Sequence, residues 1–277
     1  MEYYMTNKTN MMICDALEEI RASKPLIHNI TNYVVMNFTA NVLLSLGASP
    51  VMAHAEEEVE EMAGIASALV LNIGTLSRPW IRAMEKAGET ASRRKIPIVL
   101  DPVGAGATRL RTETASRLIE RVHPSVVRGN ASEILSLGIE NGSTKGVDST
   151  RSVNDAVAFS NTVSLEKNCV VAITGPRDYI TDGRRAFSLS NGHAFLGMVT
   201  GTGCAATTMI AAFCAVTKDP LAGTVAGLTV FGIAGEMAAE RATGPGSFKV
   251  ALIDALNEIE EKHINTSSRV EEITSTE

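Results

Sequence analysis

The chain has 277 residues and a formal net charge of −6 at pH 7, and 45% of its residues are hydrophobic although only 4% are aromatic. A net negative surface argues against nucleic acid or an anionic membrane as the partner, so we expect a small-molecule ligand. The four cysteines show no close paired spacing, which disfavours a zinc site and a disulfide framework and favours a reducing, cytoplasmic compartment.

The N-terminal segment lacks a basic region followed by an apolar core, so the sequence predicts no secretory signal. The longest apolar stretches, residues 209–216 and 221–235, are too short or too rich in glycine for a membrane span. We therefore expect a soluble chain whose ends, at about residues 1–9 and 265–277, are frayed.

The helices are predicted from apolar residues at helical spacing and from their end signals. The first covers residues 10–22, and the second runs from about Val34 to Leu46 and ends at Gly47. The acidic run 56–61 opens the third, where its negative charge suits the helix dipole. Further helices are expected over residues 77–94, 112–122, 152–166, 203–216, 221–242 and 249–262, and a loop rich in glycine and serine is expected over 140–151.

Short apolar runs between these helices predict the strands, and the continuous runs are typical of strands buried on both faces. Strands are expected within residues 25–33, 47–52, 68–74, 96–101, 124–128, 169–174 and 193–199. Residues 179–189 alternate around Asp182-Gly183, which predicts a β-hairpin. Strands that alternate with helices predict one three-layer α/β/α domain, residues 1–277, with a mostly parallel central sheet.

The turn Val199-Thr-Gly-Thr-Gly-Cys204 precedes a helix rich in small apolar residues. Gly201 and Gly203 lack a Cβ, which lets a phosphate approach the main chain at a helix N-terminus, where free N–H groups and the dipole favour an anion. A glycine-rich turn before a helix is also common without any ligand, and this one is not a Walker A sequence because no Lys follows the second glycine. The turn alone therefore indicates an anion site without deciding it.

Several polar residues follow predicted strands, and in an open parallel sheet the carboxyl ends of the strands share one edge, where ligands bind. These residues are Asp101, Arg128, Asn130, Glu133, Thr174, Gly201 and Cys204. Each could be ordinary: Asp101 could be a cap, Arg128 and Glu133 a surface pair, and Thr174 part of a plain turn. Together, two acidic groups, an arginine and a backbone anion site are what phosphoryl transfer with Mg²⁺ requires.

Two amides, Asn29 and Asn32, come directly after the first predicted strand. Either could cap the helix that follows, which is the usual role of such a residue. Either could instead line a substrate pocket, and the sequence leaves both roles open.

These motifs closely resemble hydroxyethylthiazole kinases, over about residues 20–260 and in the right order. The segments that carry the resemblance are His28-Asn-Ile-Thr-Asn32, Gly47-Ala-Ser-Pro-Val-Met52, Leu100-Asp-Pro-Val-Gly-Ala-Gly106, Arg128-Gly-Asn-Ala-Ser-Glu133, Ile173-Thr-Gly175, Thr200-Gly-Thr-Gly-Cys204 and Gly244-Pro-Gly-Ser-Phe248. The resemblance implies a ribokinase-like fold without a lid domain, a homotrimer, and ATP-dependent phosphorylation of the primary alcohol of 5-(2-hydroxyethyl)-4-methylthiazole in thiamine biosynthesis or salvage.

The resemblance also implies roles for individual residues. It places nucleotide contacts on Arg128 and Thr174, beside Asn130, and the acidic groups around Mg²⁺ on Asp101 and Glu133. The substrate contacts that it implies are Met52 and Gly201, with Asn29 and Asn32 nearby. The family's thiazole lies at subunit boundaries, so Met52 and Gly201 around one substrate could come from different chains.

Cys204 stands where wider ribokinase-like relatives carry an aspartate, whereas thiazole kinases carry the cysteine. A helix N-terminus can lower the pKa of a thiol, which would suit a proton acceptor. A thiolate would also repel the incoming phosphoryl group, so our hypothesis is that Cys204 orients the hydroxyl or accepts its proton late. The amides of residues 201–204, with Gly201 and Gly203 in the turn, are then expected to matter more than the thiol, since losing one such donor typically costs ~10²–10³ in rate.

Two other functions remain open from the sequence. One is a ribokinase-like kinase for a different small alcohol, such as a hydroxymethylpyrimidine. The other is a non-catalytic binder that senses a phosphorylated vitamin precursor, since a shared fold does not prove a shared activity. Asp101 and Glu133 argue against the sensor, because a sensor has no need of Mg²⁺ at the terminal phosphate.

Overall fold

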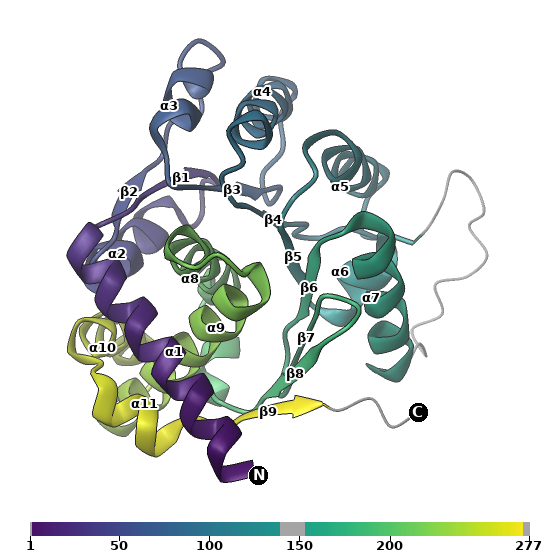
Figure 1. Cartoon of the computed structure of the whole chain (residues 1–277). Coiled ribbons are helices and arrows are strands. Elements are labelled where there is room, and N and C mark those ends of the chain that lie inside the picture. The colour runs from purple at the N-terminus through teal and green to yellow at the C-terminus, as the bar shows by residue number, and fades with distance from the viewer. Residues whose placement is uncertain (1, 139–152, 274–277) are drawn as a thin grey trace.

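A computed structural model of the chain describes residues 2–138 and 153–273, so the loop predicted at 140–151 lies outside the described residues. The strands form one nine-stranded sheet in the order β2-β1-β3-β4-β5-β6-β7-β8-β9 (Figure 1). Their bounds are β1 Leu26–Ile30, β2 Ser49–Val51, β3 Ala68–Asn72, β4 Ile98–Asp101, β5 Val126–Gly129, β6 Val170–Ile173, β7 Asp178–Thr181, β8 Ala186–Leu189 and β9 Val270–Ile273. The first six are parallel and the last three pair antiparallel, so the predicted mostly parallel sheet is confirmed.

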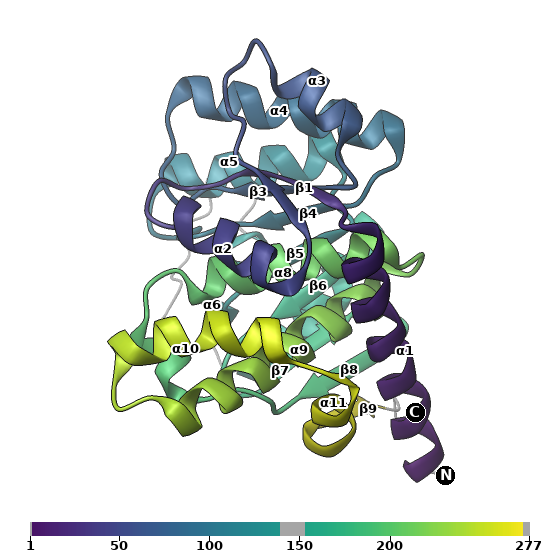
Figure 2. The same ribbon diagram turned by 90° about the vertical axis from the view of Figure 1, so that its left-hand side faces the viewer.

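Helices cover both faces of the sheet (Figures 1 and 2). On one face lie α3 Val59–Ile65, α4 Arg78–Arg94, α5 Arg109–Val122, α6 Ala131–Ser136 and α7 Val153–Lys167, and on the other lie α1 Glu2–Ser23, α2 Met36–Leu46, α8 Thr202–Val216, α9 Pro220–Arg241, α10 Pro245–Glu258 and α11 Glu261–Ser267. A short 3₁₀ helix, η1 Ala194–Met198, precedes α8.

The two faces of the sheet bury separate cores because side chains alternate along a strand. In β3, Val70 packs with α8 and α9 in one apolar cluster, whereas Leu69 and Leu71 pack with α4 and α5 in the other. The continuous apolar runs of the sequence therefore mark strands buried on both faces, as predicted. Helix α9 is long and apolar enough to cross a membrane by length and composition, but 83% of its most apolar window is buried inside the molecule, as in a core helix.

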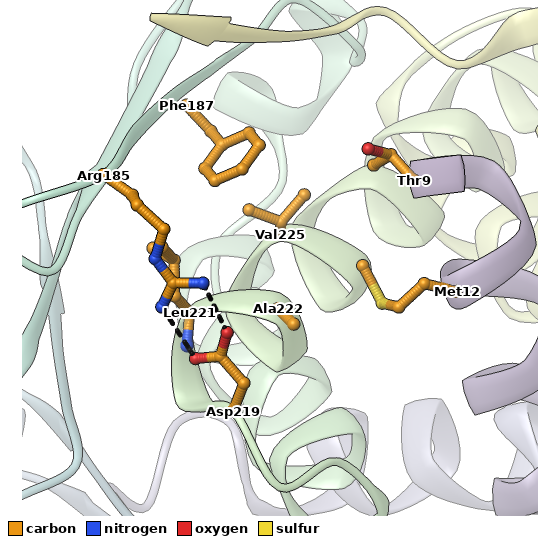
Figure 3. A pocket seen from close by; sticks show the side chains of 8 residues that line it. All are labelled: Thr9, Met12, Arg185, Phe187, Asp219, Leu221, Ala222 and Val225. Atoms are coloured by element: carbon orange, nitrogen blue, oxygen red, sulfur yellow. Dashed lines mark hydrogen bonds and ion pairs between the residues drawn. The ribbon is translucent and has the colours of Figure 1, made fainter. Parts of the chain in front are cut away.

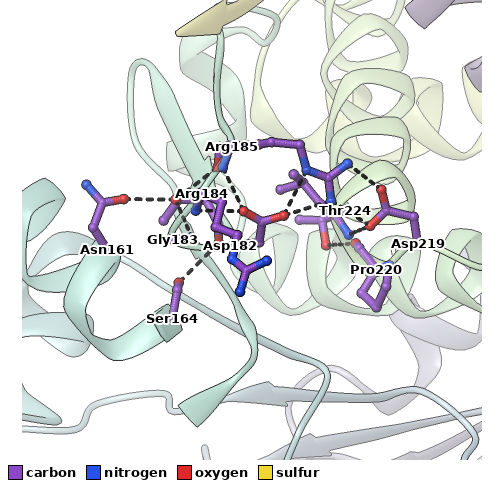
Figure 4. Close-up of polar contacts among 11 residues, drawn as sticks. Asn161, Ser164, Asp182, Gly183, Arg184, Arg185, Asp219, Pro220 and Thr224 are labelled. Atoms are coloured by element: carbon purple, nitrogen blue, oxygen red, sulfur yellow. Dashed lines mark hydrogen bonds and ion pairs between the residues drawn. The ribbon is translucent and has the colours of Figure 1, made fainter. Parts of the chain in front are cut away.

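The β7–β8 hairpin is confirmed, and polar contacts tie it to the neighbouring helices. Its turn has Gly183 at φ +84°, and the Asp182 carboxylate accepts hydrogen bonds from the backbone N–H groups of Arg184 and Arg185. The Arg185 guanidinium donates to the carboxylate of Asp219, which caps α9, and this pair lines one side of a cavity of about 60 Å³ (Figure 3). On the other side, Ser164 of α7 donates to the backbone of Thr181 (Figure 4).

The structure corrects the prediction of a strand at residues 193–199. This segment forms η1, whose first turn is capped by His193 accepting from the N–H of Phe195. A strand here would need a free sheet edge beside β8, but β9 pairs with β8 instead. The local pattern of residues 193–199 could not show this, because β9 lies some seventy residues further along the chain.

The predicted ends of several elements also differ from the structure. In the described part of the chain α1 begins at Glu2, and α11 and β9 extend to Ile273, within the segments where the sequence predicts no helix or strand. The helix predicted over 249–262 begins at Pro245, because proline suits the first helical turn, and it ends at Glu258. Helix α6 was not predicted, and it begins with the capping box formed by Asn130 and Glu133.

Candidate active site

The carboxyl ends of the parallel strands and the N-terminus of α8 meet at one edge of the sheet. Helix α8 packs against β1, β3 and β4. Its first residues therefore lie beside Asn72 and Asp101, the last residues of β3 and β4, which are neighbours in register. This is the edge at which open parallel sheets bind ligands.

The turn before α8 has the geometry that the glycines predict. Gly201 is the N-cap residue at φ +92°, and a Cβ there would lie 2.8 Å from Cγ1 of Val35. The hydroxyl of Thr202 donates to the carbonyls of Leu196 and Val199 and so fixes the turn. In the described part of the chain, Ala205 is the first residue of α8 whose backbone N–H has an acceptor, which is the carbonyl oxygen of Gly201. The N–H groups of residues 202–204 are thus available to an anion.

Asp101 is fully buried at the end of β4, and its two carboxylate oxygens differ. Oδ2 accepts hydrogen bonds from Nδ2 of Asn72 at 2.8 Å and from the hydroxyl of Thr207 at 2.9 Å. Oδ1 is buried and has no hydrogen-bond partner in the described part of the chain. Burial raises the pKa of Asp101 to about 6, although the charge of Arg128 opposes this shift, and the nearby Glu133 adds to it.

Cys204 accepts hydrogen bonds from two amides. The sulfur lies 3.4 Å from Nδ2 of Asn32 and 3.2 Å from Nδ2 of Asn72. Burial first, and the charge of Asp101 second, raise the pKa of the thiol to about 12. The pKa of Cys204 is thus raised, and not lowered as the position at a helix N-terminus suggested, because the thiol is buried beside a carboxylate.

Glu133 is held in place by backbone N–H groups. Its Oε2 accepts from the N–H of Asn130 at 2.9 Å, while Oδ1 of Asn130 accepts from the N–H of Glu133. Its Oε1 accepts from the N–H of Gly104, in the loop after Asp101, at 2.8 Å. The carboxylate therefore joins the loops that follow β4 and β5, and it lies near enough to Asp101 to affect that residue's pKa.

Arg128 connects this carboxylate site to a cavity of about 680 Å³. Its Nη1 lies 3.9 Å from Oδ2 of Asp101, and its Nη2 donates to the hydroxyl of Thr174. Its Nε is buried and has no partner among the described residues. A Cβ on Gly203 would lie 2.9 Å from Nη1, so a side chain at this position would displace the guanidinium from the helix terminus.

The cavity lies between the ends of β5 and β6, the start of α8, η1 and α9. Polar residues line one part of it, and Leu196, Leu228 and Phe231 line another; the polar set is Arg128, Asn130, Thr174, Asp178, Asn191, His193 and Thr202. Burial raises the pKa of Asp178 to about 6, opposed by the N–H of Gly175 and the charge of Arg128. The cavity thus offers cationic and polar groups at one part and apolar side chains at another, as a nucleotide requires.

The structure places only some of the predicted substrate residues in the site. Asn32 and Gly201 lie in the site, but Asn29 is 1% exposed and its amide is used internally, accepting from Thr208 and donating to the carbonyl of Ile27. Met52 is half-buried just beyond β2, at the opposite edge of the sheet from β9, and it does not line the 680 Å³ cavity.

Sequence reasoning missed Asn72, Thr207 and Asp178. Asn72 ends an apolar strand just as Asp101 does, so the same pattern could have singled it out. Thr207 lies one helical turn after Gly203, on the face of α8 toward the sheet, and only the packing of α8 reveals its contact with Asp101. In the described ranges no three His, Cys, Asp or Glu side chains gather as a ready-made metal cluster.

The chain is similar to known proteins over nearly its whole length. The profile of the Hydroxyethylthiazole kinase family matches residues 17–262. The hydroxyethylthiazole kinase of Desulfotalea psychrophila is 52% identical over 267 residues, which are 96% of this chain and 98% of that protein. The solved structure of a hydroxyethylthiazole kinase protein from Pyrococcus horikoshii OT3 has a TM-score of 0.87 at 50% identity, with 95% of this chain and 99% of that chain covered.

A more distant likeness concerns the fold alone. A ribokinase-like superfamily protein from Enterococcus faecalis V583 has a TM-score of 0.61 at 14% identity, with 90% of this chain and 95% of that chain covered. The predicted three-layer fold is therefore a ribokinase-like one.

Proposed function

This chain belongs to the hydroxyethylthiazole kinase family. From that premise we propose that it transfers the terminal phosphoryl group of ATP to the hydroxyl oxygen of 5-(2-hydroxyethyl)-4-methylthiazole in thiamine salvage, with ADP as the leaving group and the hydroxyl proton released to solvent. The observation that carries this proposal is the free N-terminus of α8 beside Arg128 and Asp101. The transition state of phosphoryl transfer gathers negative charge on the moving group, and such charge is stabilised by fixed N–H donors and a guanidinium.

The nucleotide is proposed to occupy the 680 Å³ cavity, with its phosphates toward Arg128, Thr174 and Asn130. The unpartnered Nε and the Nη groups of Arg128 can donate to phosphate oxygens. The N–H groups of residues 202–204 then receive the terminal phosphate, and Leu228 and Phe231 offer apolar contact to the nucleoside.

Magnesium is proposed to bind at Asp101. The buried and unpartnered Oδ1 fits this role, because a carboxylate oxygen without a donor is a suitable ligand for a cation. Magnesium commonly takes one or two protein carboxylates together with phosphates and water, so a three-carboxylate cluster is not needed. Glu133, whose oxygens each hold one backbone N–H, supports this site from the next loop. The ion would neutralise charge on the phosphates.

The alcohol is proposed to enter from the other side of the α8 N-terminus, where the surface is apolar. Tyr33, Val34 and Met198 are each more than 60% exposed, and Val35 packs on Gly201. Such a rim suits a small heteroaromatic ring better than a sugar, which would leave its hydroxyl groups unpaired. Within this site the neutral thiol of Cys204 is proposed to orient the hydroxyl, and buried Asn29 to support the neighbouring loop.

The assembly and location are proposed from the same premise. A homotrimer would cover the exposed apolar residues at this mouth and would bring Met52 of one subunit to the substrate of another. All four cysteines are free, which suits a reducing cytoplasm. We treat residues 1–277 as a single domain.

The experiment is a coupled assay of ADP release from purified protein with ATP, Mg²⁺ and a panel of alcohols. We expect turnover with the thiazole alcohol, loss of turnover when EDTA removes Mg²⁺, and much weaker turnover with a hydroxymethylpyrimidine. Preference for the pyrimidine would show that the pyrimidine, and not the thiazole alcohol, is the substrate. Binding of the thiazole alcohol without ADP release would support a sensor.

A further inference from the structure

Two buried asparagines form a hydrogen-bonded chain through the centre of the site. The backbone N–H of Gly74 donates to Oδ1 of Asn72 at 3.0 Å, and the carboxylate of Asp101 accepts from Nδ2 of the same amide. An N–H on one side and a carboxylate on the other leave only one orientation for this amide. The backbone N–H of Val34 likewise donates to Oδ1 of Asn32 at 3.1 Å and fixes that amide.

The orientation of Asn72 decides which oxygen of Asp101 is left free. Its Nδ2 holds Oδ2 at 2.8 Å, and Thr207 holds the same oxygen from α8. Both donors act on Oδ2, so the carboxylate plane cannot turn without losing them, and Oδ1 remains the unpartnered atom. Since Asn72 is 1% exposed, no water can readily replace its donor.

The same amide also decides what Cys204 can do. Nδ2 groups of Asn72 and Asn32 both donate to the sulfur, at 3.2 and 3.4 Å, and thereby use its capacity to accept. The proton of the neutral thiol is then the group that Cys204 can offer to a ligand. One side chain therefore sets the orientation of both a carboxylate and a thiol across the site.

We infer that Asn72 is a positioning residue for phosphoryl transfer, which holds Oδ1 of Asp101 toward the metal and leaves the S–H of Cys204 free for the acceptor alcohol. This inference rests on the proposed function. The glycine that follows supports it: a Cβ on Gly74 would lie 2.8 Å from Nδ2 of Asn32, so the two amides can meet only because residue 74 has no side chain.

The experiment compares Asn72→Ala with the wild type in two readouts. Groups that orient a metal ligand typically contribute about 10- to 100-fold, so we expect kcat to fall by about that factor while KM for the thiazole alcohol changes little. We also expect a smaller metal-dependent gain in affinity for AMP-PCP, measured by calorimetry with Mn²⁺ and with EDTA. The second readout applies even if the true acceptor is another alcohol, so it separates this inference from the proposed function.

Asn161→Ala is the matched control. Asn161 of α7 accepts hydrogen bonds from Tyr179 and Thr181 of β7, and β7 is separated from β4 by two strands, so losing Asn161 removes polar contacts without touching the site. We expect the control to lower the melting temperature without changing kcat or the Mn²⁺-dependent affinity. Equal effects of the two variants on both readouts would overturn the inference.

Asn72→Asp is the second variant of this experiment, and it replaces Asn72→Ala if that variant does not fold. It keeps the acceptor for Gly74 and the shape of the side chain but replaces the donor to Asp101 with an oxygen, so like charges would meet. We expect it to lose kcat at least as strongly as the alanine variant. Near wild-type kcat and Mn²⁺-dependent affinity in this variant would show that Asn72 only fills space.

Discussion

At the scale of the residue, Cys204 shows how its surroundings set the chemistry of a side chain. A helix N-terminus favours the thiolate, but burial and the charge of Asp101 raise the pKa of this thiol to about 12. The result is a neutral hydrogen-bond donor at a position where a base could have been expected.

Replacing Cys204 with serine tests this role. A hydroxyl can donate in the same direction, so we expect Cys204→Ser to retain kcat within about tenfold and to leave the pH dependence of kcat between pH 7 and 9 unchanged. Cys204→Ala, which has no donor, should lose more. If the wild type shows an ionisation near pH 8 that disappears in the serine variant, the thiol acts as a base.

Asp178 gives a prediction about stability. Burial raises its pKa from the ordinary 3.8 to about 6, so the folded state binds this proton more tightly than the unfolded state. Ionisation of Asp178 therefore lowers the free energy of unfolding as the pH rises from about 4 to above 6, by at most about 3 kcal/mol. We expect Asp178→Asn, which can still accept from Gly175, to raise the melting temperature at pH 7.5 and much less at pH 4.5. An equal shift at both pH values would contradict this.

The residues of the site could be predicted only in part. The positions of Asp101, Arg128, Thr174 and Glu133 at one edge follow from the rule that parallel strands end together. Thr207 of α8 helps to decide which oxygen of Asp101 is hydrogen-bonded and which has no partner. Thr208 of the same helix donates to the amide of Asn29 and so keeps this amide in the protein interior. Those contacts depend on how α8 packs on the sheet, which no local pattern encodes.

At the scale of the element, the C-terminal segment supports the wall of the large cavity. Glu236 of α9 accepts from the N–H of Gly192 at 2.6 Å and from Nδ2 of Asn191, and it pairs with Arg269 just before β9. The backbone N–H of Arg269 in turn donates to Oδ1 of Asn191 at 2.8 Å. Asn191 and Gly192 line the cavity, so a segment predicted to fray helps to shape the site.

Arg269→Met tests this support. We expect removal of this ion pair to weaken ATP binding by about 1 kcal/mol, which would raise KM for ATP by about three- to tenfold and leave KM for the alcohol unchanged. Arg241→Met is the control, because Arg241 pairs with Glu258 between α9 and α10 and neither residue lines the cavity. If both variants change KM for ATP equally, the ion pair at β9 has no special role.

The helices and strands were predicted well where the apolar residues kept one spacing throughout a segment. Strands β3, β4 and β6 and helices α4, α5 and α8 follow the sequence closely because apolar runs, caps and glycines agree there. The prediction failed at residues 193–199 and missed β9, because strand pairing is decided by which edge of the sheet is free. The edge beside β8 is taken by β9, which only the tertiary structure reveals.

At the scale of the whole molecule, alternating strands and helices predict the layers but not the strand order. The order β2-β1-β3-β4-β5-β6 brings the end of β4 to the middle of the parallel part, so Asp101 is buried while the cavity opens beside β5 and β6. The burial that raises the pKa of Asp101 is thus a consequence of topology, and the sequence pattern alone could not assign it.

The exposed apolar residues beside α8 lead to a prediction about assembly. Tyr33 and Val34 are 63% and 65% exposed, and burying them against another subunit would be favourable. Light scattering should give the mass of three chains for the wild type, and Val34→Asp should reduce both the mass and the catalytic efficiency with the alcohol. A fully active wild-type monomer would contradict a site shared between subunits.

The most direct test of the account is a crystal structure with AMP-PCP, Mg²⁺ and the thiazole alcohol. We expect the terminal phosphate to lie within hydrogen-bond distance of the N–H groups of residues 202–204, the ion to contact Oδ1 of Asp101, and the alcohol oxygen to face the phosphate beside Cys204. A terminal phosphate bound elsewhere, with these N–H groups facing only water, would contradict it.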